Sequence, residues 1–223
     1  MKTPSLFGIT YQWLAIYESL SLIGSSYSLY NQPMGNGERV ILLPGFGVDS
    51  NTMLPLEKYL KFLGYNSSGW KLGANKGNVG TYTSKMIENL EKEKEPVHLV
   101  GWSLGGTIAR EVARERPELV KQVISIGSPL IGGPKYTVTA HFYKAKGHDI
   151  DSIENNINQR IKQKLRCPRT SIYSKIDGVV HWQASIDPED PETDYIEVFQ
   201  THFGLGLSAS VYKIIARKLY ENK

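Results

Sequence analysis

The sequence is poor in cysteine, in long hydrophobic runs and in charge of one sign. Its one cysteine, Cys167, excludes an intramolecular disulfide, and no pair of His or Cys residues has a spacing typical of zinc ligands. The net charge of +4 arises from 26 basic and 22 acidic residues that are scattered along the chain. We therefore expect no metal, no cofactor and no nucleic-acid partner.

The first 37 residues carry very little charge. Between Lys2 and Glu38 the only charged residue is Glu18, and the longest apolar run, Trp13 to Tyr17, is too short to span a membrane. The stretch also lacks the pattern of a signal peptide. Apolar residues recur at near-helical spacing over residues 5–23, which predicts a helix packed on the domain. The alternative is an interfacial helix, so we expect a cytoplasmic protein with peripheral membrane contact as a second possibility.

The remaining chain alternates short apolar runs with amphipathic stretches. Strands are expected at 39–43, 65–70, 97–100, 123–126, 171–174 and 196–199, and helices at 53–63, 83–94, 108–116, 153–165 and 211–220. This alternation predicts an α/β fold with a mainly parallel central sheet of about six strands and helices on both faces. We expect one domain over 1–223, with 1–37 as an N-terminal helical segment and 134–169 as a cap or lid. Thr83 or Ser84 is the expected N-cap of the helix at 83–94.

The most informative motif is a Gly-x-Ser-x-Gly sequence formed by Gly101, Ser103 and Gly105. It lies between a buried strand and a helix, the context in which a nucleophilic serine stands on a sharp turn. The turn strains the serine backbone, and glycines two residues to either side avoid a steric collision. This pattern predicts that Ser103 is the nucleophile of a serine hydrolase.

The partners of such a serine follow it in the order acid, then histidine. Asp177 comes after the strand at 171–174 and is the predicted acid, whereas His202 comes after the strand at 196–199 and is the predicted general base. Asp187, Asp190 and Asp194 compete for the acid role. His181, four residues beyond Asp177, is the main rival base, while His98, His141 and His148 are expected to be structural or exposed.

An acyl-transfer site also needs donors for an oxyanion. The backbone N–H of Leu104 follows the nucleophile, and that of Phe46 lies in the glycine-rich loop after the first strand, so we expect these two groups to form the oxyanion hole. The expected cap carries candidate residues for the lining of an acyl pocket: His141, Phe142, Tyr143, Ile150, Ile153, Ile157 and Ile161.

Five segments together resemble the small lipase- and esterase-like α/β hydrolases of bacteria. They are Leu42 to Phe46, Gly69 to Asn75, Gly101 to Gly106, Tyr173 to Gly178, and His202 to Leu205. The resemblance implies an α/β-hydrolase fold and cofactor-independent cleavage of carboxylic esters, with Ser103, Asp177 and His202 as catalytic triad and Phe46 and Leu104 as oxyanion donors. Many relatives have His-Gly in place of Pro44-Gly45, and the fold often begins with two extra strands, so a trimmed sheet is expected here.

The sequence therefore predicts an ester hydrolase that forms an acyl-enzyme on Ser103 and accepts a small-molecule or lipid ester. An acyltransferase is the closest alternative, because an alcohol or thiol can replace water as acceptor with the same triad. A catalytically silent fold that binds a ligand or a protein is the alternative from another class. Haloalkane chemistry is disfavoured because the elbow carries serine rather than aspartate.

Overall fold

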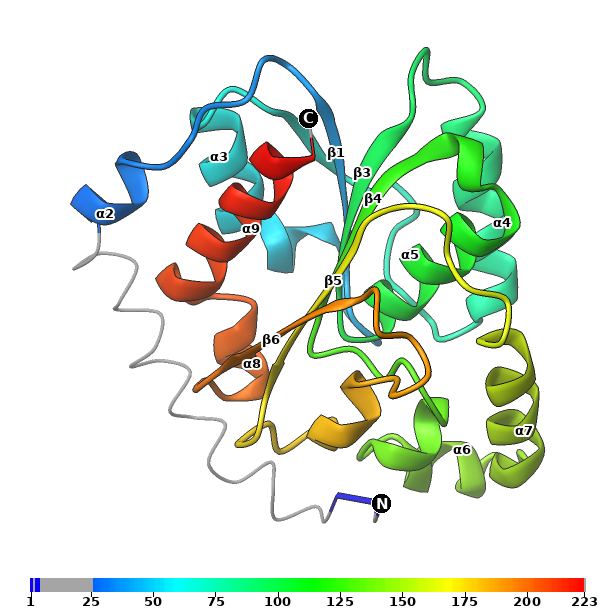
Figure 1. Cartoon of the computed structure of the whole chain (residues 1–223). Coiled ribbons are helices and arrows are strands. Elements are labelled where there is room, and N and C mark those ends of the chain that lie inside the picture. The colour runs from blue at the N-terminus through cyan, green and yellow to red at the C-terminus, as the bar shows by residue number, and fades with distance from the viewer. Residues whose placement is uncertain (2, 5–25, 223) are drawn as a thin grey trace.

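The fold is built on a six-stranded parallel sheet (Figure 1). The structure, a computed structural model, describes residues 1, 3–4 and 26–222. The strands are β1 (Arg39–Leu43), β2 (Asn66–Gly69), β3 (Val97–Trp102), β4 (Val120–Ile126), β5 (Arg169–Ser174) and β6 (Asp194–Val198). They lie in the order β2-β1-β3-β4-β5-β6, and every pair is parallel. The predicted α/β class and the sheet of about six strands are confirmed.

Helices cover both faces of this sheet (Figure 1). The α-helices are α2 (Ser26–Tyr30), α3 (Leu54–Phe62), α4 (Val79–Leu90), α5 (Leu104–Glu115), α6 (Ala140–Ala145), α7 (Ile150–Arg160), α8 (His202–Leu205) and α9 (Ala209–Glu221). Short 3-10 turns occur at Ser50–Met53, Pro117–Leu119, Gly133–Tyr136 and Trp182–Ser185. The expected helix over residues 5–23 lies outside the described residues.

Successive strand residues pack alternately into two separate hydrophobic cores, one on each face of the sheet. In β1, Val40 and Leu42 pack with α3 and α9, whereas Ile41 and Leu43 pack on the other face with α4 and α5. Because successive side chains of a strand point to opposite faces, a strand buried on both faces must be apolar throughout. The short apolar runs that predicted the strands are therefore the middle layer of a three-layer structure.

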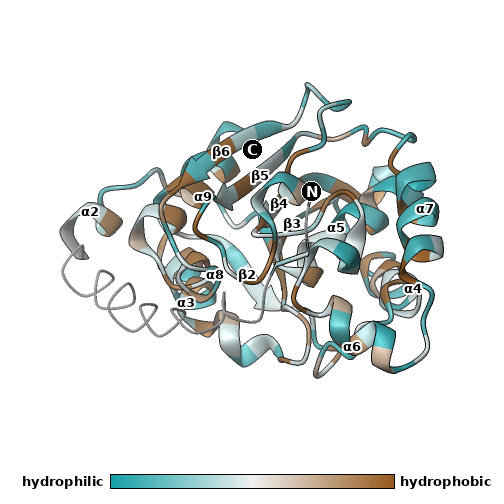
Figure 2. Ribbon diagram, turned by 90° about the horizontal axis from the view of Figure 1, so that it is seen from below, coloured by the Kyte–Doolittle hydropathy of each residue, from teal (hydrophilic) through white to brown (hydrophobic). Residues whose placement is uncertain are grey.

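The predicted start of α4 needs correction. Helix α4 begins at Val79, because the Asn78 side chain accepts a hydrogen bond from Thr81 N–H and caps the helix five or six residues earlier than expected. The prediction of Thr83 or Ser84 as the cap is wrong, and Thr83 is instead a buried residue within the helix. Between β4 and β5, part of the expected 134–169 segment forms α6 and α7, and α7 is largely hydrophilic (Figure 2).

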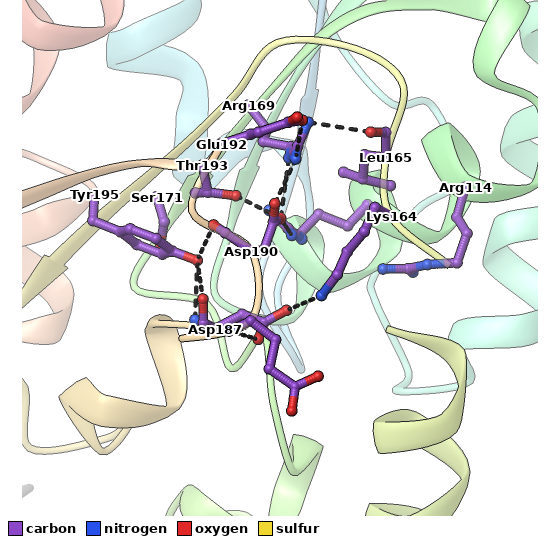
Figure 3. Close-up of polar contacts among 12 residues, drawn as sticks. Arg114, Lys164, Leu165, Arg169, Ser171, Asp187, Asp190, Glu192, Thr193 and Tyr195 are labelled. Atoms are coloured by element: carbon purple, nitrogen blue, oxygen red, sulfur yellow. Dashed lines mark hydrogen bonds and ion pairs between the residues drawn. The ribbon is translucent and has the colours of Figure 1, made fainter. Parts of the chain in front are cut away.

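A buried ion-pair network joins the β5–β6 connection to the rest of the fold. The Asp190 carboxylate, 2% exposed, accepts hydrogen bonds from Arg169, from Thr193 and from Nη2 of Arg110 on α5. Figure 3 shows the Asp190 side chain beside those of Arg169 and Thr193. Burial alone would raise the pKa of Asp190, but the hydrogen bonds from Arg169 and Thr193 outweigh it and lower the pKa to about 2. The carboxylate is therefore ionised at neutral pH, as this network requires.

His98 is buried near the start of β3, at the end of the sheet away from the Gly-x-Ser-x-Gly turn. Its Nδ1 lies 3.2 Å from Oε1 of Gln122 and donates to it, since that oxygen is only an acceptor. The Nε2 atom is buried and has no partner among the described residues. Burial lowers the pKa of His98 from 6.5 to about 4, so the ring is neutral in the folded protein.

The first prediction concerns acid stability. Since His98 binds a proton more readily in the unfolded chain, its contribution to stability is complete above pH 6.5 and is lost as the pH falls toward 4. The loss should approach about 3 kcal/mol, and His98→Asn should flatten this part of the profile of unfolding free energy against pH. His148→Asn, at an exposed histidine, is the control and should leave the slope unchanged. An equal slope in the His98 variant would contradict the assignment.

The second prediction concerns the network. Asp190→Asn removes the charge that faces two buried guanidinium groups, and we expect a loss of about 3–5 kcal/mol in urea unfolding. Asp194→Asn is the matched control, because Asp194 is half exposed and pairs with Lys218 at the surface. That substitution should cost about 1 kcal/mol or less. Similar losses in both variants would show that burial of the pair does not govern its contribution.

Candidate active site

The turn between β3 and α5 holds Ser103 in a strained backbone conformation. Its φ and ψ are 54° and −124°, and Ser103 and Lys71 are the two described non-glycine residues with positive φ. The Ser103 N–H donates to Ile126 O over 2.8 Å, and Ser103 O accepts from Gly106 N–H at 3.0 Å. These bonds fix the turn to β4 and to α5, so the strain is supported by the surrounding structure.

Glycines make this turn possible because three chain segments meet without room for side chains. A Cβ on Gly101 would lie 2.4 Å from Gly105 C, and a Cβ on Gly105 would lie 2.1 Å from the backbone oxygen of Leu43. On Gly106 it would lie 2.0 Å from Ser128 Oγ. The two glycines predicted to avoid a collision therefore do so, and a third shares the task.

The structure brings Asp177 and His202 together. His202 Nδ1 lies 2.7 Å from Asp177 Oδ2, and the other carboxylate oxygen accepts the N–H groups of Val179 and Val180, each over 2.8 Å. Because a carboxylate only accepts, Nδ1 of His202 is the donor, which leaves Nε2 available to another group. Both side chains are almost fully buried.

His202 is also tied to the residue before Ser103. The indole Nε1–H of Trp102 donates to His202 O over 3.3 Å, and the two rings stack with centroids 5.7 Å apart. The β3–α5 turn and the β6–α8 turn thus meet at the carboxyl edge of the sheet, where the ends of parallel strands carry functional groups.

The rivals considered from the sequence lie elsewhere. His181 Nδ1 is buried with no partner among the described residues, so His181 does not share Asp177 with His202. Asp190 belongs to the ion-pair network, and Asp187 pairs with Lys164. Asp194 pairs with Lys218. Among the candidates, Asp177 and His202 are the pair that the fold places in contact.

The loop after β1 is held by Asn75, whose position was not predicted to matter. Its Nδ2 donates to Pro44 O over 2.9 Å, its backbone O accepts from Gly47 N–H at 2.7 Å, and its N–H donates to Val48 O. Asn75 is fully buried. The only sequence signal was its place in the Gly69 to Asn75 segment, because a buried asparagine after a strand is otherwise typical of any tight turn.

A cavity of about 600 Å³ opens at this edge of the sheet, and Phe46, Ser103 and Leu104 all contribute to its wall. The segment between β4 and β5 forms another wall, and of the apolar residues expected there Phe142, Tyr143, Ile153, Ile157 and Ile161 line the cavity, whereas His141 and Ile150 do not. The segment contacts the opposite wall through an edge-to-face pair of Phe142 with Phe46, and through Tyr143 OH, which donates to Gly77 O.

Comparison with solved structures identifies the architecture. The mouse α/β hydrolase domain-containing protein 10 covers 86% of this chain with a TM-score of 0.62 at 19% identity, and 91% of that chain is covered. A monoacylglycerol lipase from Paleococcus ferrophilus gives the same TM-score at 16% identity over 85% of this chain and 97% of the other. The family model described as the alpha/beta hydrolase fold matches residues 39–142. The chain has the α/β-hydrolase fold.

The relatives found by sequence carry one activity name. A pimeloyl-[acyl-carrier protein] methyl ester esterase of Pseudoalteromonas atlantica is 30% identical over 149 residues, which cover 62% of this chain and 51% of that protein. The protein of the same name from Aliivibrio salmonicida is 30% identical over 105 residues, 45% of this chain and 40% of the other. The chain thus spans about half the length of the curated relatives it matches.

The part of the chain that the structure describes contains no helix both long and apolar enough to cross a membrane. Within the same residues, no group of three or more His, Cys, Asp or Glu side chains is arranged to hold a metal ion.

The third prediction tests the packing of the turn. Gly105→Ala places a methyl group against the backbone of β1, which cannot move aside, so we expect a loss of about 1–3 kcal/mol or more in urea unfolding. Gly80→Ala is the control on α4, where the nearest atom would be Asn78 Oδ1 at 3.9 Å. It should stabilise the protein by up to about 1 kcal/mol, because alanine favours helix. Equal effects at the two sites would contradict the steric explanation.

Proposed function

We propose that this α/β hydrolase is a carboxylic ester hydrolase in which Ser103, Asp177 and His202 form the catalytic triad. The observation that carries the proposal is the 2.7 Å contact of His202 Nδ1 with Asp177, at the same sheet edge as the strained Ser103 turn. The contact fixes the tautomer in which Nε2 is free to accept a proton. A fold that only binds a ligand has no need of this arrangement.

In the proposed acylation, Ser103 Oγ attacks the ester carbonyl carbon while His202 Nε2 takes the hydroxyl proton. The tetrahedral intermediate collapses, the bond to the alcohol oxygen breaks, and the imidazolium returns the proton to the leaving alcohol. Water then attacks the acyl-enzyme by the same route, which releases the carboxylic acid and restores Ser103. Asp177 accepts the hydrogen bond from His202 Nδ1 and stabilises the imidazolium.

The proposed oxyanion hole consists of the N–H groups of Leu104 and Phe46. Leu104 is the first residue of α5, so its N–H has no acceptor within the helix, and the helix dipole favours negative charge at this point. Asn75 holds the loop that carries Phe46 through its bonds to Pro44 and Gly47. Donors fixed in advance stabilise the transition state because they need no reorganisation during the reaction.

The substrate class follows from the cavity and the relatives together. The segment between β4 and β5 contributes the apolar side chains of Phe142, Ile153 and Ile157 to the cavity that Ser103 also lines, which suits the acyl part of a small-molecule or lipid ester. The curated relatives are named as methyl ester esterases, which supports an ester as the substrate here. Water is the proposed acceptor of the acyl group. The cytoplasmic location and the membrane contact through residues 5–23 stay predictions.

The fourth prediction is that a fluorophosphonate probe labels the protein on Ser103. Ser103→Ala should abolish labelling, and His202→Ala and Asp177→Asn should slow it by about a hundredfold or more, because the serine loses its base or the base its orientation. His181→Ala is the matched control and should label at the normal rate. Product analysis with p-nitrophenyl butyrate should give butyric acid, even with added alcohol.

Absence of labelling in well-folded protein would contradict the proposed function and favour the silent binding fold. Labelling lost in the His181 variant but kept in the His202 variant would reassign the base. Transfer of the butyryl group to the added alcohol in preference to water would establish the acyltransferase alternative.

A further inference from the structure

The cavity extends from Ser103 along the side of α5. Thr107 and Arg110 follow Ser103 at intervals of four and three residues, and both line the cavity, as expected for positions on one face of a helix. Arg110 therefore lies roughly 10 Å along the helix axis from the nucleophile. The cavity is also lined by Thr83 of α4, the helix that packs against α5.

Thr83 and Arg110 each carry a buried polar side-chain atom that forms no hydrogen bond within the described residues. Thr83 is 2% exposed and Arg110 is 5% exposed, yet Thr83 Oγ1 and Arg110 Nη1 have no hydrogen-bond partner among the described residues. Six other buried side-chain atoms share this property, but none of their residues lines the cavity. Since buried polar groups are normally hydrogen-bonded, two unpartnered atoms in residues that line one cavity point to a ligand group.

The guanidinium of Arg110 is fixed in place before any ligand arrives. Its Nη2 donates to Asp190 over 3.2 Å, and Asp190 is held in turn by Arg169 and Thr193, so the fork is oriented with Nη1 left over. Burial without full pairing lowers the pKa of Arg110, a sign that its charge is incompletely solvated.

The charges around the cavity favour an anion. Its lining includes five basic residues, Lys76, Arg110, Arg114, Lys146 and Arg160, against two acidic ones, Glu111 and Glu115. Glu111 and Glu115 pair with Arg114 and Arg160, which leaves Lys76, Lys146 and Arg110 as the basic residues of the lining without an acidic partner in it. A carboxylate near Arg110 would thus meet a positive field and an oriented donor, the combination that gives strong, directional hydrogen bonds.

We propose that Thr83 Oγ1 and Arg110 Nη1 form a subsite for a carboxylate at the far end of the acyl chain, so that the preferred substrates are monoesters of dicarboxylic acids. This inference rests on the proposed function, since it defines the acyl group that Ser103 receives. The apolar side chains of Phe142, Ile153 and Ile157 hold the methylene chain, and the two polar side chains select its end.

The test compares esters that differ only at the distal carbon. We would measure kcat/KM for the mono-p-nitrophenyl esters of adipate and suberate against p-nitrophenyl hexanoate and octanoate, which match them in chain length. The native protein should prefer the carboxylate ester of at least one pair by about tenfold or more. Thr83→Val, which replaces the hydroxyl by a methyl group, should lower this preference severalfold, and Arg110→Gln should abolish it.

Thr81→Val is the matched control, because Thr81 is exposed on the same helix and lies outside the cavity. Its preference should equal that of the native protein. If Arg110→Gln proves unstable in thermal unfolding because it disturbs Asp190, Thr83→Val still decides the outcome, since its hydroxyl takes part in no network.

Two results would overturn the subsite without touching the proposed function. One is equal or better hydrolysis of the alkyl esters in both pairs by a protein that the fluorophosphonate labels. The other is an equal preference for p-nitrophenyl ω-hydroxyhexanoate, which would replace the charge by a simple hydrogen bond. Failure of the proposed function has a different signature, because then no ester is cleaved and Ser103 is not labelled.

Discussion

A single steric constraint governs the carboxyl edge of this sheet: Ser103 must turn sharply between β3 and α5 with its side chain clear of the backbone. The turn has positive φ, which is costly for a residue with a Cβ atom, and is sustained by bonds to β4 and α5. Close approach of β1, β3 and α5 then forbids side chains at Gly101 and Gly105. The position of the nucleophile, the start of the helix and the spacing of three strands are consequences of one another.

Around that turn, polar side chains position the loops that the sheet alone leaves undefined. Hydrogen bonds of Asn75 hold the loop after β1, and those of Asp177 hold both its own loop and the imidazole of His202. Hydrogen bonds of Asp190 hold the connection between β5 and β6. Each of these side chains is buried, so water does not compete for its hydrogen bonds. The apolar cores build the layers, whereas these three residues set where the loops between the layers lie.

The sequence was sufficient for the sheet because buried parallel strands must be apolar on both faces, and such runs are easily seen. Ser103, Asp177 and His202 could be predicted as site residues because each follows a strand, and the apolar pattern shows where that strand ends. The start of α4 was missed because Asn78 lies in a loop rich in glycine and asparagine, where several residues are plausible caps. The pairing of Asp190 with Arg110 and Arg169 was out of reach, because it joins residues 80 and 21 positions apart that carry no motif.

The position of His202 after β6 has a consequence for how the molecule loses activity. In the described residues β6 is an outermost strand that pairs only with β5, so half of its backbone groups have no sheet partner. Strands of this kind exchange their amide hydrogens through local fraying, at a lower free energy than global opening requires. Detachment of β6 would withdraw the proposed base while the nucleophile turn, deep in the sheet, stays intact. Reversible inactivation by heat should therefore precede the loss of secondary structure.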